Sequence, residues 1–167
     1  VPVTASYIIA AVMVAPALVD AGVAPVAAHM FIFYYAVLSE VSPPTALAPF
    51  AAAAVTGGDP QGTLAAAWRY TAPAFVVPIA FAIAPAGTGL LFQGGAAGIL
   101  LTSVTALAGV IVLAWALGHE SGAKRRFLFR LGLLGGGLAL LYPAIGADLL
   151  GMALVGVTVL MARAEIV

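Results

Sequence analysis

Four consecutive residues, Ser42-Pro43-Pro44-Thr45, place two hydroxyl side chains and two prolines inside an apolar part of the sequence. Proline has no amide hydrogen and disfavours helical geometry in the residue before it, so a helix must stop here. A stopped helix releases backbone carbonyls that lipid cannot satisfy, and transporters place such breaks where they line an ion or substrate site. Sodium is a hard cation that prefers carbonyl and hydroxyl oxygens, which this segment supplies. The alternative is that the two prolines form a loop at the membrane interface.

The other chemically versatile side chains form no recognisable catalytic arrangement. Glu40 precedes the proline pair, where it could serve an intramembrane site or face water. His29 lies among apolar residues with no second metal-ligand type spaced around it, which favours a packing histidine over a ligand. His119 and Glu120 fall in a polar loop and are expected to be solvated. With no cysteine and no Ser/His/acid arrangement, we expect neither an enzyme nor a bound cofactor.

The composition places these residues in a membrane protein. Hydrophobic residues make up 64% of the 167 and charged residues only 7%, whereas a soluble domain carries about 25% charged residues. Residues 70–118 contain no Asp, Glu, Lys or Arg, which is enough for two spans of roughly 20 residues and a turn. The net charge of zero gives no electrostatic basis for binding nucleic acid. Because the chain opens without a Met or a signal peptide, we expect a fragment of a longer protein.

Proline and glycine divide the chain into about seven predicted helices. Asp59 is the expected cap of the fourth, and Pro60 its first residue. That helix is expected to start along the interface, through Trp68 and Tyr70, and to turn inward at residue 72. The third helix, at roughly 11 residues, is too short to cross a bilayer alone. The predicted ranges are residues 4–19, 25–41, 45–55, 60–84, 96–117, 127–142 and 148–162.

The basic residues predict an orientation, because cytoplasmic flanks collect Lys and Arg. If the last four helices alternate in direction, Arg69, residues 124–130 and Arg163 all lie on one side of the membrane. The turns at residues 85–95 and 143–147 then face outward.

A run of glycines, Gly135-Gly136-Gly137, follows Gly132 in the sixth predicted helix. No strand precedes the run, so a nucleotide-binding loop is not expected. Small residues in a membrane helix instead allow close helix packing.

Residues 28–48, which read AHMFIFYYAVLSEVSPPTALA, resemble the large membrane subunit of the tripartite ATP-independent periplasmic (TRAP) transporters. The similarity is greatest to the fused permeases of the TAXI branch. The opening residues 1–7 resemble the end of the Gly-x-Gly-x-Pro-x-Thr-Ala-x-Tyr signature of that family, and residues 58–60 match its usual continuation. Ser42 stands where Thr is more usual, which keeps the hydroxyl. The resemblance covers about residues 1–85, whereas residues 86–167 resemble only the carboxy-terminal membrane extension of these fused permeases.

The resemblance implies a sodium-driven secondary transporter in the inner or plasma membrane of a prokaryote. Such a transporter would take up organic anions delivered by a TAXI-type extracytoplasmic solute-binding protein, with sodium as the coupling ion. The implied fold is an all-α, polytopic elevator fragment with a re-entrant hairpin, a broken helix and about four further spanning helices. Residues 1–85 would be the carboxy-terminal part of the transport domain, and residues 86–167 a transmembrane extension.

On the family pattern, residues 2–6 lie at or just after a hairpin tip and residues 42–45 form the unwound part of a broken helix. The side chains expected to bind substrate or sodium are then Thr4, Ser6, Ser42, Pro43, Pro44 and Thr45. Carbonyls near Val41 and Pro43 would add to them, with Ser42 and Thr45 as the sodium ligands and Pro2, Pro43 and Pro44 as structural breaks. A non-transporting structural or accessory membrane subunit, with breaks that are merely structural, is the alternative.

Overall fold

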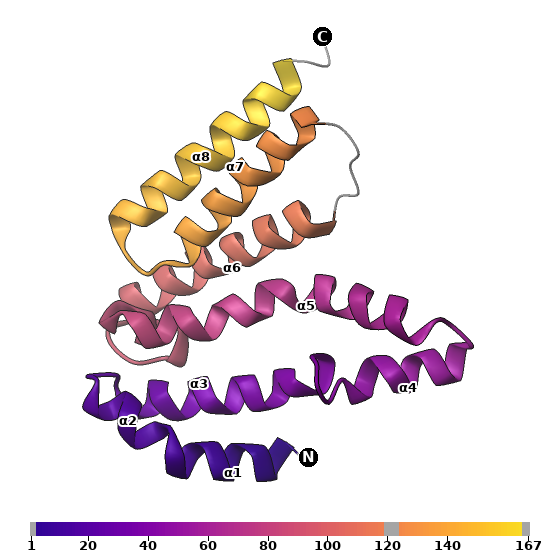
Figure 1. Cartoon of the computed structure of the whole chain (residues 1–167). Helices are drawn as coiled ribbons and strands as arrows, with labels where there is room; N and C mark the ends of the chain where they lie inside the picture. Colours follow the sequence, from indigo (N-terminus) through magenta and orange to yellow (C-terminus); the bar gives the residue numbers. More distant parts are fainter. Residues whose placement is uncertain (1–2, 119–123, 165–167) are drawn as a thin grey trace. The chain divides into compact units, whose positions relative to one another are not determined.

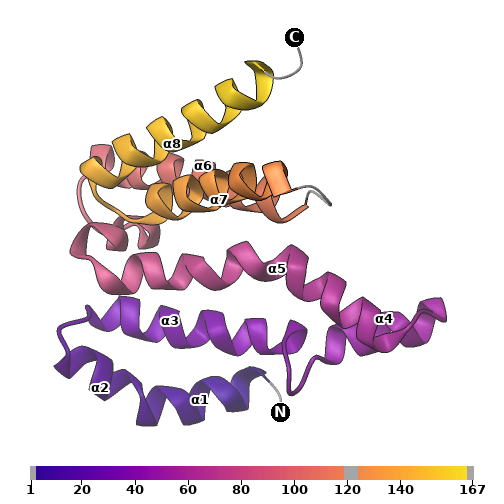
Figure 2. The same cartoon turned by 45° about the horizontal axis from the view of Figure 1, so that its top comes forward.

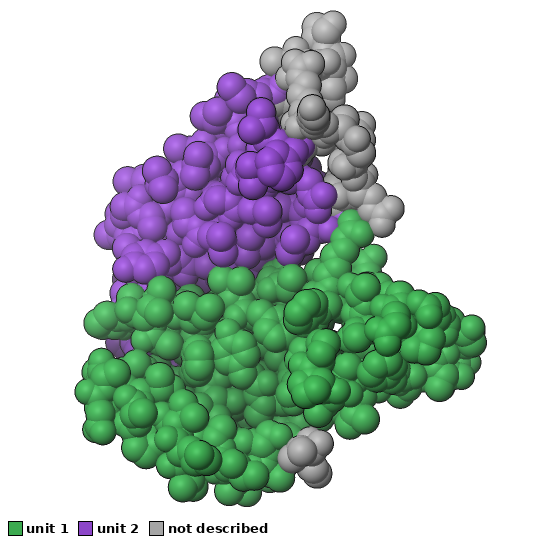
Figure 3. All heavy atoms as spheres, in the orientation of Figure 1, with its two compact units in different colours: residues 1–85 green, residues 86–167 purple. Residues whose placement is uncertain are grey.

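The computed structural model describes residues 3–118 and 124–164, with the side chains of residues 3–118 and 127–161 (Figure 1). These residues form α-helices and two 3-10 helices, and no strand occurs in the part of the chain described. The all-α fold expected from the sequence is confirmed. Two compact units make up the chain, unit 1 (Val1–Pro85) and unit 2 (Ala86–Val167), which are described separately below (Figure 3).

The described residues of unit 1 form five α-helices and one short 3-10 helix. They are α1 (Val3–Met13), α2 (Ala15–Asp20), α3 (Pro25–Leu38), η1 (Ser39–Val41), α4 (Leu47–Thr56) and α5 (Pro60–Ile83). Helix α3 lies at the centre, because α1, α2 and α5 all contact it. The buried residues of α3 are small or aliphatic: Ala27, Ala28, Ile32, Ala36 and Leu38.

The expected single helix over residues 4–19 is two helices, α1 and α2, divided at Val14. Pro16 explains the division, because it has no amide hydrogen to donate to the carbonyl of Val12 four residues earlier. Both halves still pack against α3. The Tyr7 ring meets the Phe33 ring edge-on, with 5.9 Å between the ring centroids.

Helix α5 begins as the sequence predicts. The Asp59 carboxylate accepts a hydrogen bond from the Gly62 amide at 2.5 Å, and Pro60 is the first helical residue. The helix then runs without interruption to Ile83, although Pro73 and Pro78 lie inside it. Both prolines are buried, so packing against the neighbouring helices holds this segment helical despite the lost amide donors.

Unit 2 contains η2 (Pro85–Leu91, which begins at the boundary), α6 (Ala96–Gly118), α7 (Lys124–Leu141) and α8 (Ile145–Ala164). Helix α7 packs against both α6 and α8. A Cβ atom added to Gly109 of α6 would lie 2.8 Å from the Gly137 carbonyl oxygen, and one added to Gly136 would lie 2.6 Å from a methyl of Val155. Glycine therefore permits both contacts of α7. Gly135 is different, since a Cβ there would meet only a methyl of Leu154 at 3.9 Å.

Two of the described helices, α5 and α6, are long and apolar enough to cross a membrane. Only 22% and 17% of their most apolar windows are buried, whereas the core helix of a soluble protein is mostly buried. Helices α7 and α8 contribute the shorter apolar segments Phe127–Leu141 and Ile145–Met161. Large exposed side chains such as Val55, Leu100 and Leu160 cover the helices with an apolar surface. The chain is therefore an all-α membrane protein.

Candidate functional site

The helix break expected at residues 42–45 is present between η1 and α4 (Figure 1). Ser42 takes an extended conformation, with φ −123° and ψ 148°, and ends the helical path that began at Pro25. The Pro43–Pro44 peptide bond is cis. Ala46 has a left-handed conformation, with φ 45°, and α4 starts directly after it. The two prolines thus separate a long helix from a short one.

The break leaves two backbone carbonyls without a helical partner. In a helix the Glu40 carbonyl would accept a hydrogen bond from residue 43 or 44, but both are prolines. The Val41 carbonyl also receives no amide from the described backbone. In contrast, the Ser42 carbonyl accepts the Ala46 amide at 3.0 Å. Adjacent free carbonyls at Glu40 and Val41 are therefore the polar groups that the break makes available.

The hydroxyls of Ser42 and Thr45 bind the same segment of backbone. Ser42 donates to the Leu38 carbonyl at 3.1 Å, and Thr45 donates to the Ser39 carbonyl. Both side chains are half-buried. Each hydroxyl hydrogen is taken up by a carbonyl, while the oxygen lone pairs stay free to coordinate a cation. Pro43 and Pro44 are exposed, consistent with a role in breaking the helix rather than filling a core.

Thr4 and Ser6 lie on α1, near its amino-terminal end. Figures 1 and 2 both show the amino-terminal end of α1 near the break between η1 and α4. Helix α1 contacts α3, but no hydrogen bond within the described residues joins Thr4 or Ser6 to the break. The structure therefore brings Ser42 and Thr45 together and leaves Thr4 and Ser6 on a neighbouring helix. Pro2 lies outside the described residues.

A polar pair that the sequence analysis missed lies between α1 and α3. The Tyr7 hydroxyl and His29 Nδ1 are 3.1 Å apart. His29 has a hydrogen-bond partner, as a packing histidine would, but its side chain is exposed. Tyr7 and His29 are separated by 22 positions, so only the packing of the two helices could reveal the pair.

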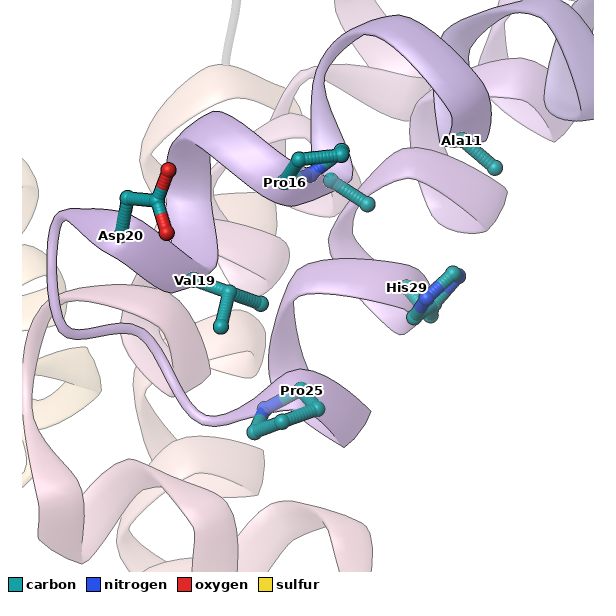
Figure 4. A pocket seen from close by; sticks show the side chains of 7 residues that line it. Ala11, Pro16, Val19, Asp20, Pro25 and His29 are labelled. Carbon is teal, nitrogen blue, oxygen red and sulfur yellow. The ribbon is translucent and has the colours of Figure 1, made fainter.

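His29 also lines a shallow pocket of about 370 Å³ where α1, α2 and α3 meet (Figure 4). The lining residues are Ala11, Ala15, Pro16, Val19, Asp20, Pro25 and His29. Asp20 and His29 are the ionisable side chains among these described lining residues, and Figure 4 shows them on opposite sides of the pocket. The division between α1 and α2 lies at this pocket, since Ala15 and Pro16 line it. A proline inside the predicted helix was the available signal in the sequence.

Comparison with known families identifies the chain. Residues 1–86 of 167 match the family model described as "Tripartite ATP-independent periplasmic transporter, DctM component". No curated protein and no solved structure gives a significant match. The matched residues comprise unit 1 with its helix break, and they are more than half of the chain. The chain therefore belongs to the DctM family, the membrane permease component of TRAP transporters.

Proposed function

We propose that this chain is part of a sodium-driven secondary permease, which takes up organic anions delivered by a TAXI-type extracytoplasmic solute-binding protein. The observation that carries the proposal is the break between η1 and α4, which lies inside the segment that matches the DctM family. TRAP permeases work in a membrane with a periplasmic solute-binding partner, which agrees with the apolar helices of this chain. Sodium coupling, the TAXI partner and the organic anion are inferences beyond the family.

The chemistry of the break supports sodium as the coupling ion. The free carbonyls of Glu40 and Val41 and the lone pairs of Ser42 and Thr45 are uncharged oxygen ligands within six residues of chain. Broken helices in transporters coordinate sodium with unwound carbonyls of this kind. Thr4 and Ser6 would complete the site, or contact the substrate, from α1. The remaining ligands would come from other parts of the permease.

The same break supports an anionic substrate. Helix α4 starts at Leu47, so its free amino-terminal amides lie directly beside the break. The amino-terminal end of a helix carries a partial positive charge and favours a carboxylate. In an elevator mechanism, unit 1 would move with the transport domain while it carries both the ion and the anion. The multi-pass location would be the inner or plasma membrane of a prokaryote, with the basic residues on the cytoplasmic side.

The full-length permease and its binding protein, reconstituted in proteoliposomes, test this function. The probes are radiolabelled organic monocarboxylates and dicarboxylates. We expect uptake only when an inward sodium gradient and the loaded binding protein are both present. Equal uptake without sodium, or without the binding protein, would contradict the corresponding part of the proposal. If the binding protein retains a probe that the permease never transports, the accessory-subunit alternative is favoured.

A further inference from the structure

Asp148 is a buried carboxyl in unit 2, outside the segment that matches the transporter family. It lies in the first turn of α8, and its side chain is only 7% exposed. Its Oδ1 atom is buried and has no hydrogen-bond partner. An ionisable side chain inside a membrane protein is costly, so its presence suggests a function.

Thr105 on α6 is a polar neighbour of this carboxyl through its hydroxyl. The same hydroxyl lies 3.3 Å from the Thr102 carbonyl on its own helix. A hydroxyl has one hydrogen and two lone pairs, so it can donate to only one of these two groups at a time. If Thr105 donates to Thr102, it can bind Asp148 only by accepting a hydrogen bond from the protonated carboxyl.

Asp148 has no cationic partner among the described side chains of unit 2. Helix α6 contains no acidic, basic, His or Tyr residue, and the described side chains of η2 and α8 include no other ionisable group. Helix α7 contributes Arg130, whose Nε donates to the Ala116 carbonyl at 3.1 Å. Ala116 is about three helical turns along α6 from Thr105. Tyr142, between α7 and α8, is exposed.

Two opposing effects act on this carboxyl. Removing a carboxylate from water without a cation carries a large desolvation penalty, which favours a bound proton. The amino-terminal end of α8 and a hydrogen bond from Thr105 would both favour the charged form, although each effect is weaker than that penalty. A metal ion would need more oxygen ligands than one carboxyl and one hydroxyl. No group of three metal-binding side chains occurs in the described chain.

We propose that Asp148 and Thr105 form a proton-binding site in unit 2. In the protonated state, the Asp148 carboxyl donates its hydrogen to Thr105, and Thr105 donates to the Thr102 carbonyl. On release, the carboxyl O–H bond breaks and the proton passes to water. Thr105 then turns its hydrogen to the carboxylate. Because Asp148 lies beyond residue 86, this site does not depend on the proposed sodium site.

Infrared difference spectroscopy of the full-length permease in liposomes tests the site, since a protonated carboxyl has its own carbonyl band. In sodium-free buffer, we expect a band that weakens as the pH is raised and shifts in heavy water. Asp148→Asn should abolish that band. Asp20→Asn, which changes an exposed carboxyl, is the matched control and should retain it.

Thr105→Val tests the hydrogen bond separately from the carboxyl. Valine has the same shape but cannot accept a hydrogen bond, so the band should move to higher wavenumber. An unmoved band would exclude Thr105 from the site. Identical spectra for the wild type and Asp148→Asn would overturn the proposal. A band that is reduced by added sodium at constant pH would also overturn it, in favour of a cation site.

Discussion

Unit 1 and unit 2 are both apolar and helical, but they differ in how their helices are interrupted and packed. In unit 1, prolines divide the helices at Pro16 and at residues 43–44, and backbone carbonyls lose their partners. In unit 2, α6, α7 and α8 run without such breaks and approach each other through glycines. The apolar composition explains why both units suit a membrane. The interruptions of unit 1 place polar backbone groups where an ion could bind.

The difference follows from what each small or cyclic residue removes. Proline removes an amide donor, so it creates a free carbonyl and a change of direction. Glycine removes a side chain, so it lets two backbones approach while the hydrogen bonds of the helix stay intact. Unit 2 should therefore be sensitive to added side-chain volume, and unit 1 to changes in hydrogen bonding.

The largest expected effect comes from Gly109→Ala in unit 2. The new methyl would lie 2.8 Å from the Gly137 carbonyl oxygen and 3.1 Å from Leu141, so α6 and α7 must move apart. We expect a loss of about 2 kcal/mol in unfolding free energy, the middle of the range for overpacked sites. Thermal unfolding in detergent, followed by circular dichroism, measures the change.

Gly135→Ala is the matched control, since the nearest atom to its new methyl is Leu154 Cδ1 at 3.9 Å. It should leave the unfolding midpoint unchanged or raise it, because alanine favours helix over glycine by about 1 kcal/mol. Equal destabilisation by the two variants would show that glycine packing is not what distinguishes unit 2.

A smaller effect is expected at the start of α5 in unit 1. Asp59→Ala removes the acceptor for the Gly62 amide and should cost about 1 kcal/mol of stability. Asp59→Asn keeps an oxygen acceptor and should stay within a few tenths of a kcal/mol of the wild type. Thermal unfolding midpoints of both variants test the cap, and equal losses would argue against it.

The smallest effect is expected for Tyr35→Phe. The Tyr35 hydroxyl donates to the Phe75 carbonyl at 2.6 Å and so joins α3 to α5. Loss of this bond should cost about 0.5–1 kcal/mol. Tyr34→Phe, whose ring packs edge-on against Phe81, is the control and should change the stability less. Hydrogen exchange of the α3 and α5 amides measures the loss of stability. Equal protection in the two variants would contradict a stabilising role for the Tyr35 hydrogen bond.

The sequence predicted the features that depend on local chemistry. The break at Pro43-Pro44 follows from the amide hydrogens that proline lacks. The Asp59 cap follows from the free amides at the start of α5, one of which needs an acceptor. The division at Pro16 was missed, because its apolar surroundings read as one continuous helix. For the candidate site, the break itself could be predicted, whereas the partners of its hydroxyls could not.

Features that depend on helix packing could not be predicted. Nothing in the run Gly135-Gly136-Gly137 reveals that the second and third glycines meet neighbouring helices while the first has space. The pairing of Tyr7 with His29 and the burial of Asp148 likewise depend on which helix surfaces meet. Contributions of Thr4 and Ser6 to the site remain predictions.

The central claim is that the break of unit 1 binds the coupling ion, and the sodium dependence of uptake tests it most directly. The double variant Ser42→Ala/Thr45→Val is compared with Ser39→Ala in the full-length permease. Ser39 lies on the adjoining 3-10 helix, and its hydroxyl donates to the Ala36 carbonyl. If the hydroxyls are ligands, the double variant should need at least about tenfold more sodium for half-maximal uptake, since about 1.4 kcal/mol corresponds to a factor of ten. Ser39→Ala should keep the wild-type dependence. An unchanged sodium dependence in the double variant would contradict the account.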